Sequence, residues 1–230
     1  MKRITLFAGH YGSGKTNIAL AYARRLRRSA GGRVAIADLD IVNPYFRTKD
    51  FAPALLAEGI ELVVSDFANS NVDFPAMPSE TYALVADRDV RVVMDVGGDD
   101  RGALALGRYV DDIREEGDYE MVGVVNACRP LTRTVRDAVA VLREIEGACS
   151  LKFTALANNT NLGAETVAET VLSSLAYAQG ISAEMGVPVI MTSCMAGIAE
   201  SLCGKVEGLF PLETVSLVPG LGKPEKENGK

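Results

Sequence analysis

A glycine-rich segment near the start of the chain has the residue types and spacing of a phosphate-binding loop. Its residues match the pattern G-x-x-x-x-G-K-[ST] and are Gly9, His10, Tyr11, Gly12, Ser13, Gly14, Lys15 and Thr16. Glycine permits torsions that turn successive backbone N–H groups inward, where they bind phosphate oxygens together with a helix N-terminus. Lys15 is expected to bridge the β- and γ-phosphates and Thr16 to ligate Mg²⁺. We therefore expect this loop and the adjacent Asn17 to contact a nucleotide.

Three aspartates stand at or just after the ends of apolar runs. Asp38 and Asp40 close the run VAIADLD, and Asp95 closes RVVMDV. In a parallel sheet the carboxyl ends of the strands line the ligand crevice, beside the loop that follows the first strand. An aspartate at such an end can hold the Mg²⁺ shell, and Asp95 fits this Walker B position. Gly98 would let a backbone N–H approach the γ-phosphate, whereas simple turn or helix-cap roles are the alternative for the aspartates.

Apolar runs that alternate with helical stretches predict how these residues are positioned. Several runs are apolar at consecutive positions (VAIA, VVMDV, MVGVV, PVIM), which is typical of strands buried on both faces. We predict a three-layer α/β/α fold of the P-loop NTPase type with a mainly parallel central sheet. The predicted strands are Ile4–Ala8, Arg33–Asp38, Ile60–Ser65, Arg91–Val96, Glu120–Asn126, Phe153–Asn158 and Val187–Met191. The clearest predicted helices are Lys15–Ser29, Thr132–Cys149 and Ala164–Met185.

Length and composition indicate one ordinary globular domain. The chain has 230 residues, of which 48% are hydrophobic and 23% charged. We expect a nucleotide-binding domain over residues 1–219 and a polar, frayed tail over residues 220–230. Four cysteines without a CxxC pair are typical of reduced thiols in a cytoplasmic protein.

The charge balance disfavours several kinds of partner. A net charge of −6 is unsuited to coating nucleic acid or anionic lipid, both of which need clustered Lys and Arg. No uncharged run reaches the roughly 20 apolar residues that a membrane-spanning helix needs. We therefore expect no membrane association and no nucleic-acid partner.

At these motifs the chain resembles the MinD/ParA-like branch of P-loop NTPases, the SIMIBI class that also holds nitrogenase iron protein and the cobyrinic acid amide synthetases. The resemblance depends on GSGKT at the loop, DLD after the second strand and DVGGD as Walker B. It implies that Asp38 orders the Mg²⁺ shell and that Asp40 orients the attacking water. Residues 40–47 and 97–100 would then be switches I and II. Asn126 and Asn158 would lie near the base, adenine in most of the family, although asparagine also satisfies loop backbone.

The chain departs from the family pattern at one informative position. Many members carry K-G-G-x-G-K-T, whose first lysine reaches the nucleotide of a partner subunit. His10 and Tyr11 replace that lysine and the following glycine here. His10 could act as a weaker donor, or the contact across a homodimer could be missing.

The motifs favour an Mg²⁺-dependent ATP-binding protein, a slow ATPase that serves as a switch or as a metallocentre or cofactor-assembly factor. A small-molecule kinase or ligase that uses ATP is the first alternative, and a nucleotide sensor without useful hydrolysis is the second. Two loops could select a small-molecule substrate or a protein partner, residues 41–47 and 66–75, although packed or polar surface turns explain them as well. The absence of an NKxD motif favours adenine over guanine.

Overall fold

A computed structural model describes residues 1–40, 48–64, 79–98 and 100–213 of the chain. These residues form a single sheet of eight strands in the order β3-β2-β4-β1-β5-β6-β7-β8, and each neighbouring pair is parallel. The strands are β1 (Ile4–Ala8), β2 (Arg33–Leu39), β3 (Ile60–Val64), β4 (Val90–Val96), β5 (Tyr119–Val125), β6 (Ala155–Asn158), β7 (Val189–Met195) and β8 (Leu209–Leu212). The predicted α/β/α fold with a parallel sheet is thereby confirmed.

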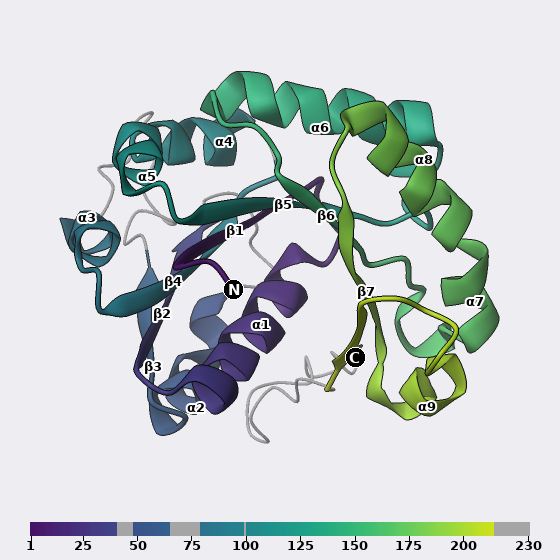
Figure 1. The fold of residues 1–230 in the computed structure, drawn as a ribbon, viewed down its shortest axis with the longest axis horizontal. Helices are drawn as coiled ribbons and strands as arrows, with labels where there is room; N and C mark the ends of the chain where they lie inside the picture. Colours follow the sequence, from purple (N-terminus) through teal and green to yellow (C-terminus); the bar gives the residue numbers. More distant parts are fainter. Residues whose placement is uncertain (41–47, 65–78, 99, 214–230) are drawn as a thin grey trace, which may run out of the picture.

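Helices cover both faces of this sheet. Figure 1 shows α1 and α2 on one face and α4, α5, α6 and α8 on the other. The helices of the described residues are α1 (Lys15–Ala30), α2 (Ala52–Ala57), α3 (Ser79–Ala86), α4 (Asp100–Gly107), α5 (Val110–Glu116), α6 (Val135–Cys149), α7 (Ala168–Ser173), α8 (Leu175–Met185) and α9 (Ala199–Leu202). In the part of the chain that the structure describes, no helix has the length and apolar composition to cross a bilayer.

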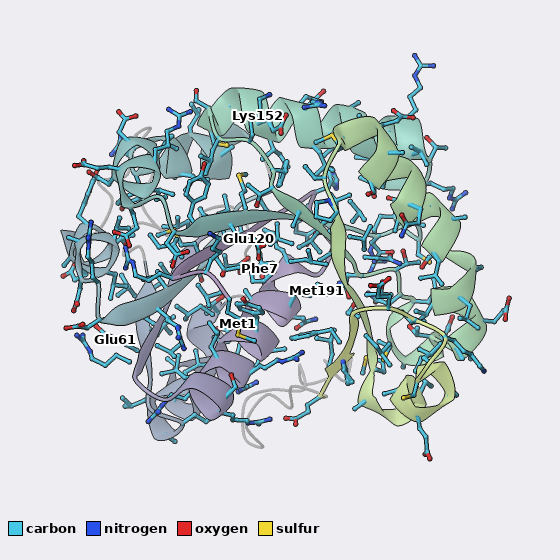
Figure 2. The ribbon with its side chains drawn as sticks, viewed as in Figure 1. Met1, Phe7, Glu61, Glu120, Lys152 and Met191 are labelled. Atoms are coloured by element: carbon cyan, nitrogen blue, oxygen red, sulfur yellow. The ribbon has the colours of Figure 1, made fainter. Side chains whose placement is uncertain are left out.

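The strands feed two separate apolar layers because successive side chains point to opposite faces. In β1, Ile4, Leu6 and Ala8 join the layer that α4, α5 and α6 cover, whereas Phe7 joins the layer under α1. Figure 2 shows side chains filling both layers, with Phe7 near the centre of the view and Lys152 toward its edge. This alternation fixes which strand residues face α1, and therefore which of them can reach the loop that precedes it.

Most of the predicted strands are confirmed, with shifts of a few residues at their ends. Strand β8 was not predicted. It is a four-residue strand at the edge of the sheet and contains Pro211, which weakens a strand pattern but is tolerated at an edge. The continuous helix expected over Ala164–Met185 was wrong. The chain forms a 3₁₀ turn and then the separate helices α7 and α8, because Thr166 has an extended backbone and Ser174 lies between the helices. Residues 41–47, 66–75 and 220–230 lie outside the described residues.

A buried arginine at the amino end of β1 forms hydrogen bonds with the end of α3, the start of β4 and the end of α5. Arg3 is 8% exposed, and its Nε donates to Glu116 Oε1 at 2.7 Å. Its two Nη atoms donate to backbone oxygens at the end of α3, in the connection to β4 and at the first residue of β4. These oxygens belong to Leu84, Val85, Asp87 and Val90. Few other side chains could satisfy so many carbonyls at once, since guanidinium carries five N–H donors.

We predict that Arg3→Ala lowers the free energy of unfolding by about 3 kcal/mol, because it removes a buried ion pair and leaves several carbonyls without a donor. Urea denaturation followed by circular dichroism measures this change. Lys2→Ala is the matched control, since the Lys2–Asp118 ion pair is about half exposed and is expected to contribute under about 1 kcal/mol. Equal unfolding midpoints for the Arg3 variant and the wild type would contradict the assignment.

Candidate functional site

The phosphate-loop sequence forms the connection between β1 and α1. Gly14 is the N-cap residue of α1 and has a φ of 86°, a left-handed conformation that L side chains rarely adopt. The next two residues, Lys15 and Thr16, begin the helix and are only 4% and 5% exposed. Tyr11 is 56% exposed, so its ring lies outside the loop and does not fill it.

Two of the predicted carboxylates are direct neighbours in the sheet. Asp38 of β2 pairs in register with Asp95 of β4, and Asp95 in turn lies opposite Phe7 of β1. The alternation of side chains places both aspartates on the face that α1 covers, because Val93 and Ile36 beside them belong to that layer. The strand register therefore brings Asp38 and Asp95 to the start of α1.

Hydrogen bonds join these carboxylates to the first residues of α1. Thr16 Oγ1 donates to Asp95 Oδ2 at 2.6 Å, and Lys15 forms an ion pair with Asp40, the residue that follows β2. The backbone N–H of Asp40 donates to Asp38 Oδ1 at 3.0 Å. Thr48, which sequence reasoning missed, donates a second hydroxyl to Asp95 Oδ2 at 3.3 Å. The structure thus brings Lys15, Thr16, Asp38, Asp40 and Asp95 together in one cluster.

The cluster holds more negative than positive charge in a place that water scarcely reaches. Burial is the main cause that raises the pKa of Asp38 to about 7, with the charge of Asp95 as the next cause. Burial also raises the pKa of Asp95. For Lys15, burial lowers the pKa, but Asp95, Asp40 and Asp38 together outweigh it, and the net shift is upward. Lys15 therefore stays protonated, while at least one carboxyl group needs a proton or a further cation.

The donor set fits Mg²⁺ bound together with a nucleotide. Asp95 Oδ1 is buried and has no hydrogen-bond partner among the described residues, which leaves an oxygen beside the Thr16 hydroxyl for a cation shell. The described residues contain no group of three or more His, Cys, Asp or Glu side chains arranged to hold a metal by themselves. Mg²⁺ usually takes one or two carboxylates and completes its shell with water and substrate phosphates. Thr16, Asp38 and Asp95 meet that requirement only if a phosphate completes the shell.

The loop after β4 lies directly against the phosphate loop. A Cβ atom added to Gly98 would come within 2.3 Å of the carbonyl oxygen of Gly9 and 2.9 Å of the Tyr11 nitrogen. Only glycine permits this backbone-to-backbone approach. Gly98 therefore lies directly against the backbone of the phosphate loop, and its contact with a γ-phosphate stays a prediction from the sequence.

The two asparagines that were expected near a base lie at neighbouring strand ends, and both are fully buried. Asn126 Oδ1 accepts from the N–H of Cys128 at 2.9 Å, whereas its Nδ2 has no partner among the described residues. Asn158 Nδ2 donates to Ser174 Oγ at 2.8 Å, and its Oδ1 accepts from the Thr160 hydroxyl at 2.8 Å. Asn126 therefore keeps a spare donor, while the amide of Asn158 binds its own chain.

Side chains that sequence reasoning did not select hold the loop from the β5 and β6 side. Asn159 Nδ2 donates to the carbonyl oxygen of Ser13 at 2.6 Å, and Arg129 Nε donates to that of Gly12 at 2.7 Å. The alternation in β6 could have indicated Asn159, because Ala155 and Ala157 face α1 and the residue two positions further continues that face.

His10 makes only a local contact in the described chain. Its Nδ1 lies 2.9 Å from the carbonyl oxygen of the adjacent Tyr11. This contact leaves the role of His10 toward a nucleotide or across a homodimer as a prediction from the sequence.

Comparison with known proteins gives similarity at the level of fold. No family model matches the chain, and no curated protein does. Solved structures of the signal recognition particle receptor FtsY are similar to this chain over most of its length. The FtsY of Elizabethkingia anophelis is 19% identical with a TM-score of 0.51, and the match covers 82% of this chain and 57% of that one. The same receptor in complex with GDP is 18% identical with a TM-score of 0.52, and the match covers 84% of this chain and 57% of that one. The FtsY of Thermotoga maritima is 17% identical with a TM-score of 0.55, and the match covers 83% of this chain and 60% of that one.

These matches define the class of fold and not the branch. The chain has the α/β/α fold of P-loop NTPases, and it spans less than two thirds of the length of these FtsY chains. At this level of identity the comparison shows the fold alone and does not separate the MinD/ParA-like branch from others.

We predict that Gly98→Ala weakens nucleotide binding by at least about tenfold and destabilises the fold by about 1–3 kcal/mol, since the new methyl group collides with loop backbone. Titration calorimetry and thermal unfolding measure the two effects. Gly107→Ala is the control, because a Cβ there meets nothing within 4 Å. Tolerance of Gly98→Ala in both assays would show that the two loops do not approach as described.

We also predict that Asp38→Asn stabilises the Mg²⁺-free protein more at pH 8 than at pH 5. The pKa of Asp38 is raised to about 7 in the folded state, so ionisation destabilises the fold as the pH rises from about 4 to 7, and the full cost remains above pH 7. Asparagine cannot ionise. The stability gain over the wild type should therefore grow by a few kcal/mol across this range in EDTA. A gain that is independent of pH would contradict a protonated Asp38.

Proposed function

We propose that the chain binds a nucleoside triphosphate with Mg²⁺ at the β1–α1 loop, hydrolyses it slowly and acts as a nucleotide-dependent switch. The cluster of Lys15, Thr16, Asp38, Asp40 and Asp95 is the observation that carries this proposal. The P-loop fold and its similarity to FtsY support the general class of nucleotide-binding protein.

In this proposal the loop and Lys15 bind the triphosphate tail. Backbone N–H groups at the start of α1 and the helix dipole attract the phosphate oxygens, and the Lys15 ammonium stabilises charge that develops on the γ-phosphoryl group. Thr16 and Asp95, with Asp38 beside them, would hold Mg²⁺, which neutralises phosphate charge when it is bound. The carboxylates would otherwise repel the tail, so we expect binding to require the cation.

Asp40 is the residue that we propose orients the attacking water. Its carboxylate forms an ion pair with Lys15. A phosphate that binds Lys15 would weaken this ion pair, and the Asp40 carboxylate would then accept a hydrogen bond from the water. The water oxygen then bonds to the γ-phosphorus while the bond from that phosphorus to the β–γ bridging oxygen breaks, and the proton of the water passes to a phosphate oxygen or to solvent. The products are the diphosphate and inorganic phosphate. Positioning and charge stabilisation supply most of the rate.

Adenine is the base that we propose. The strand-end segments carry amide and hydroxyl side chains at Asn126 and Asn158–Thr160, and no NKxD aspartate that would accept from guanine follows them. The structure of FtsY with GDP favours guanine as a second candidate. Direct comparison of ATP with GTP separates the two.

The biological output of the switch is proposed from the sequence resemblance alone. That output would be the assembly of a metallocentre or cofactor. The protein could act in this role as a homodimer. The alternative function, a small-molecule kinase or ligase, would use residues 66–75 to bind the acceptor molecule. These residues lie outside the part of the chain that the structure describes. A sensor without hydrolysis would use the same loop. Single-turnover phosphate release distinguishes a sensor from an ATPase.

We predict that Mg·ATP binds the wild type more tightly than Mg·GTP, and that EDTA or Lys15→Ala weakens binding at least about tenfold, because each removes positive charge from the phosphate site. Asp40→Asn should bind Mg·ATP several-fold more tightly, since Lys15 loses its competing partner, yet release phosphate about 10²-fold more slowly. Titration calorimetry and single-turnover phosphate release measure these values.

Circular dichroism confirms that each variant is folded before it is titrated. Equal affinity of wild type and folded Lys15→Ala would refute the phosphate site. Unchanged hydrolysis by Asp40→Asn would leave the site intact and remove Asp40 from the reaction.

A further inference from the structure

Asn159 makes a buried bridge between the phosphate loop and the ends of β6 and β7. Its Nδ2 donates to the carbonyl oxygen of Ser13 at 2.6 Å, and its Oδ1 accepts from the hydroxyl of Ser193. All three residues are 2% exposed. The orientation of the amide follows from chemistry, because a carbonyl oxygen can only accept and its partner must be the NH₂ group. Water cannot readily replace either bond.

The position of Asn159 is fixed by backbone as well as by side chain. Its N–H donates to the carbonyl oxygen of Val125 at 2.8 Å, at the end of β5. Asn158, one residue earlier, faces the opposite side of the sheet and bonds to Ser174. Asn159 therefore presents its amide to the loop from a rigid part of the sheet.

The carbonyl that Asn159 holds belongs to the peptide that opens α1. In a planar trans peptide the C=O and N–H groups point in opposite directions, and no cis peptide bond occurs among the described residues. Holding the Ser13 oxygen toward Asn159 therefore aims the Gly14 N–H away from β6. That N–H is among the first-turn donors that an α-helix leaves without intrahelical partners, and these donors bind phosphate in a loop of this kind.

The Asn159 amide and the phosphate loop are in close contact at Gly14. A Cβ atom at Gly14 would lie 2.2 Å from Asn159 Nδ2, and its φ of 86° also favours glycine. The amide therefore touches the loop where the backbone turns into the helix.

We propose that Asn159 is a positioning residue that sets the orientation of the Ser13–Gly14 peptide for the triphosphate tail, with Ser193 holding its amide in place. The inference rests on the proposed nucleotide site and deepens it. It assigns Asn159 to the phosphate end of the nucleotide and not to recognition of the base.

The test uses Mg·tripolyphosphate, a probe with no base, beside Mg·ATP and Mg·GTP in titration calorimetry of the full chain. Asn159→Ala should weaken Mg·tripolyphosphate and the preferred nucleotide by the same factor of about tenfold. Asn161→Ala is the matched control, because it removes a nearby amide that bonds to the Asn159 carbonyl oxygen but does not reach the loop. Its affinities should stay within about twofold of the wild type.

The outcomes separate the roles. Loss of nucleotide affinity with unchanged tripolyphosphate affinity would make Asn159 a base-reading residue and overturn the proposal. A lower melting temperature with both affinities unchanged would show a purely structural role and overturn it too. If Asn159→Ala does not fold, Ser193→Ala decides, with an expected loss of about threefold for both probes, and no loss refutes the proposal. A wild type that binds none of the probes refutes the proposed function itself.

Discussion

The cluster at the start of α1 depends on one electrostatic constraint, in which three carboxylates surround a single ammonium group where water is scarce. Asp38 and Asp95 lie side by side in register, and Lys15 pairs with Asp40. Opposite charges in such a place attract strongly, but the uncompensated carboxylates cost free energy. The protein can relieve that cost by binding a proton or a divalent cation. The same imbalance therefore links the acid–base behaviour of these carboxylates to the proposed binding of Mg²⁺ and phosphate.

The parallel sheet makes this constraint possible. Every strand of the described sheet runs in the same direction, so all carboxyl ends meet at one edge. Alternation then decides which residues at that edge face α1, as it does for Asp38 and Asp95. Asn158 and Asn159 are adjacent in the chain, yet their side chains point to opposite faces of the sheet. Asn158 bonds to Ser174, whereas Asn159 bonds to the phosphate loop.

The sequence alone predicts the parts of the candidate site whose residues lie close together in the chain. The loop from Gly9 to Thr16 and the strand-end aspartates were predictable because their chemistry follows from a short motif and from the end of an apolar run. Thr48 and Ser193 were not, because their contacts with Asp95 and Asn159 join segments far apart in the chain. The hydrogen bond from the Asn158 amide to the Ser174 hydroxyl likewise joins β6 to the short connection between α7 and α8, and no local pattern indicated it.

The buried guanidinium of Arg3 lies at the amino ends of the strands, whereas the phosphate loop lies at their carboxyl ends. The five residues of β1 between them span about 17 Å at roughly 3.3 Å each. The Arg3 contacts thus stabilise the amino ends of the strands, at a distance from the cluster of charged residues at their carboxyl ends. Substitutions that rigidify the Arg3 end can be combined with changes in ligand preference at the loop end, since sites this far apart contribute nearly additively.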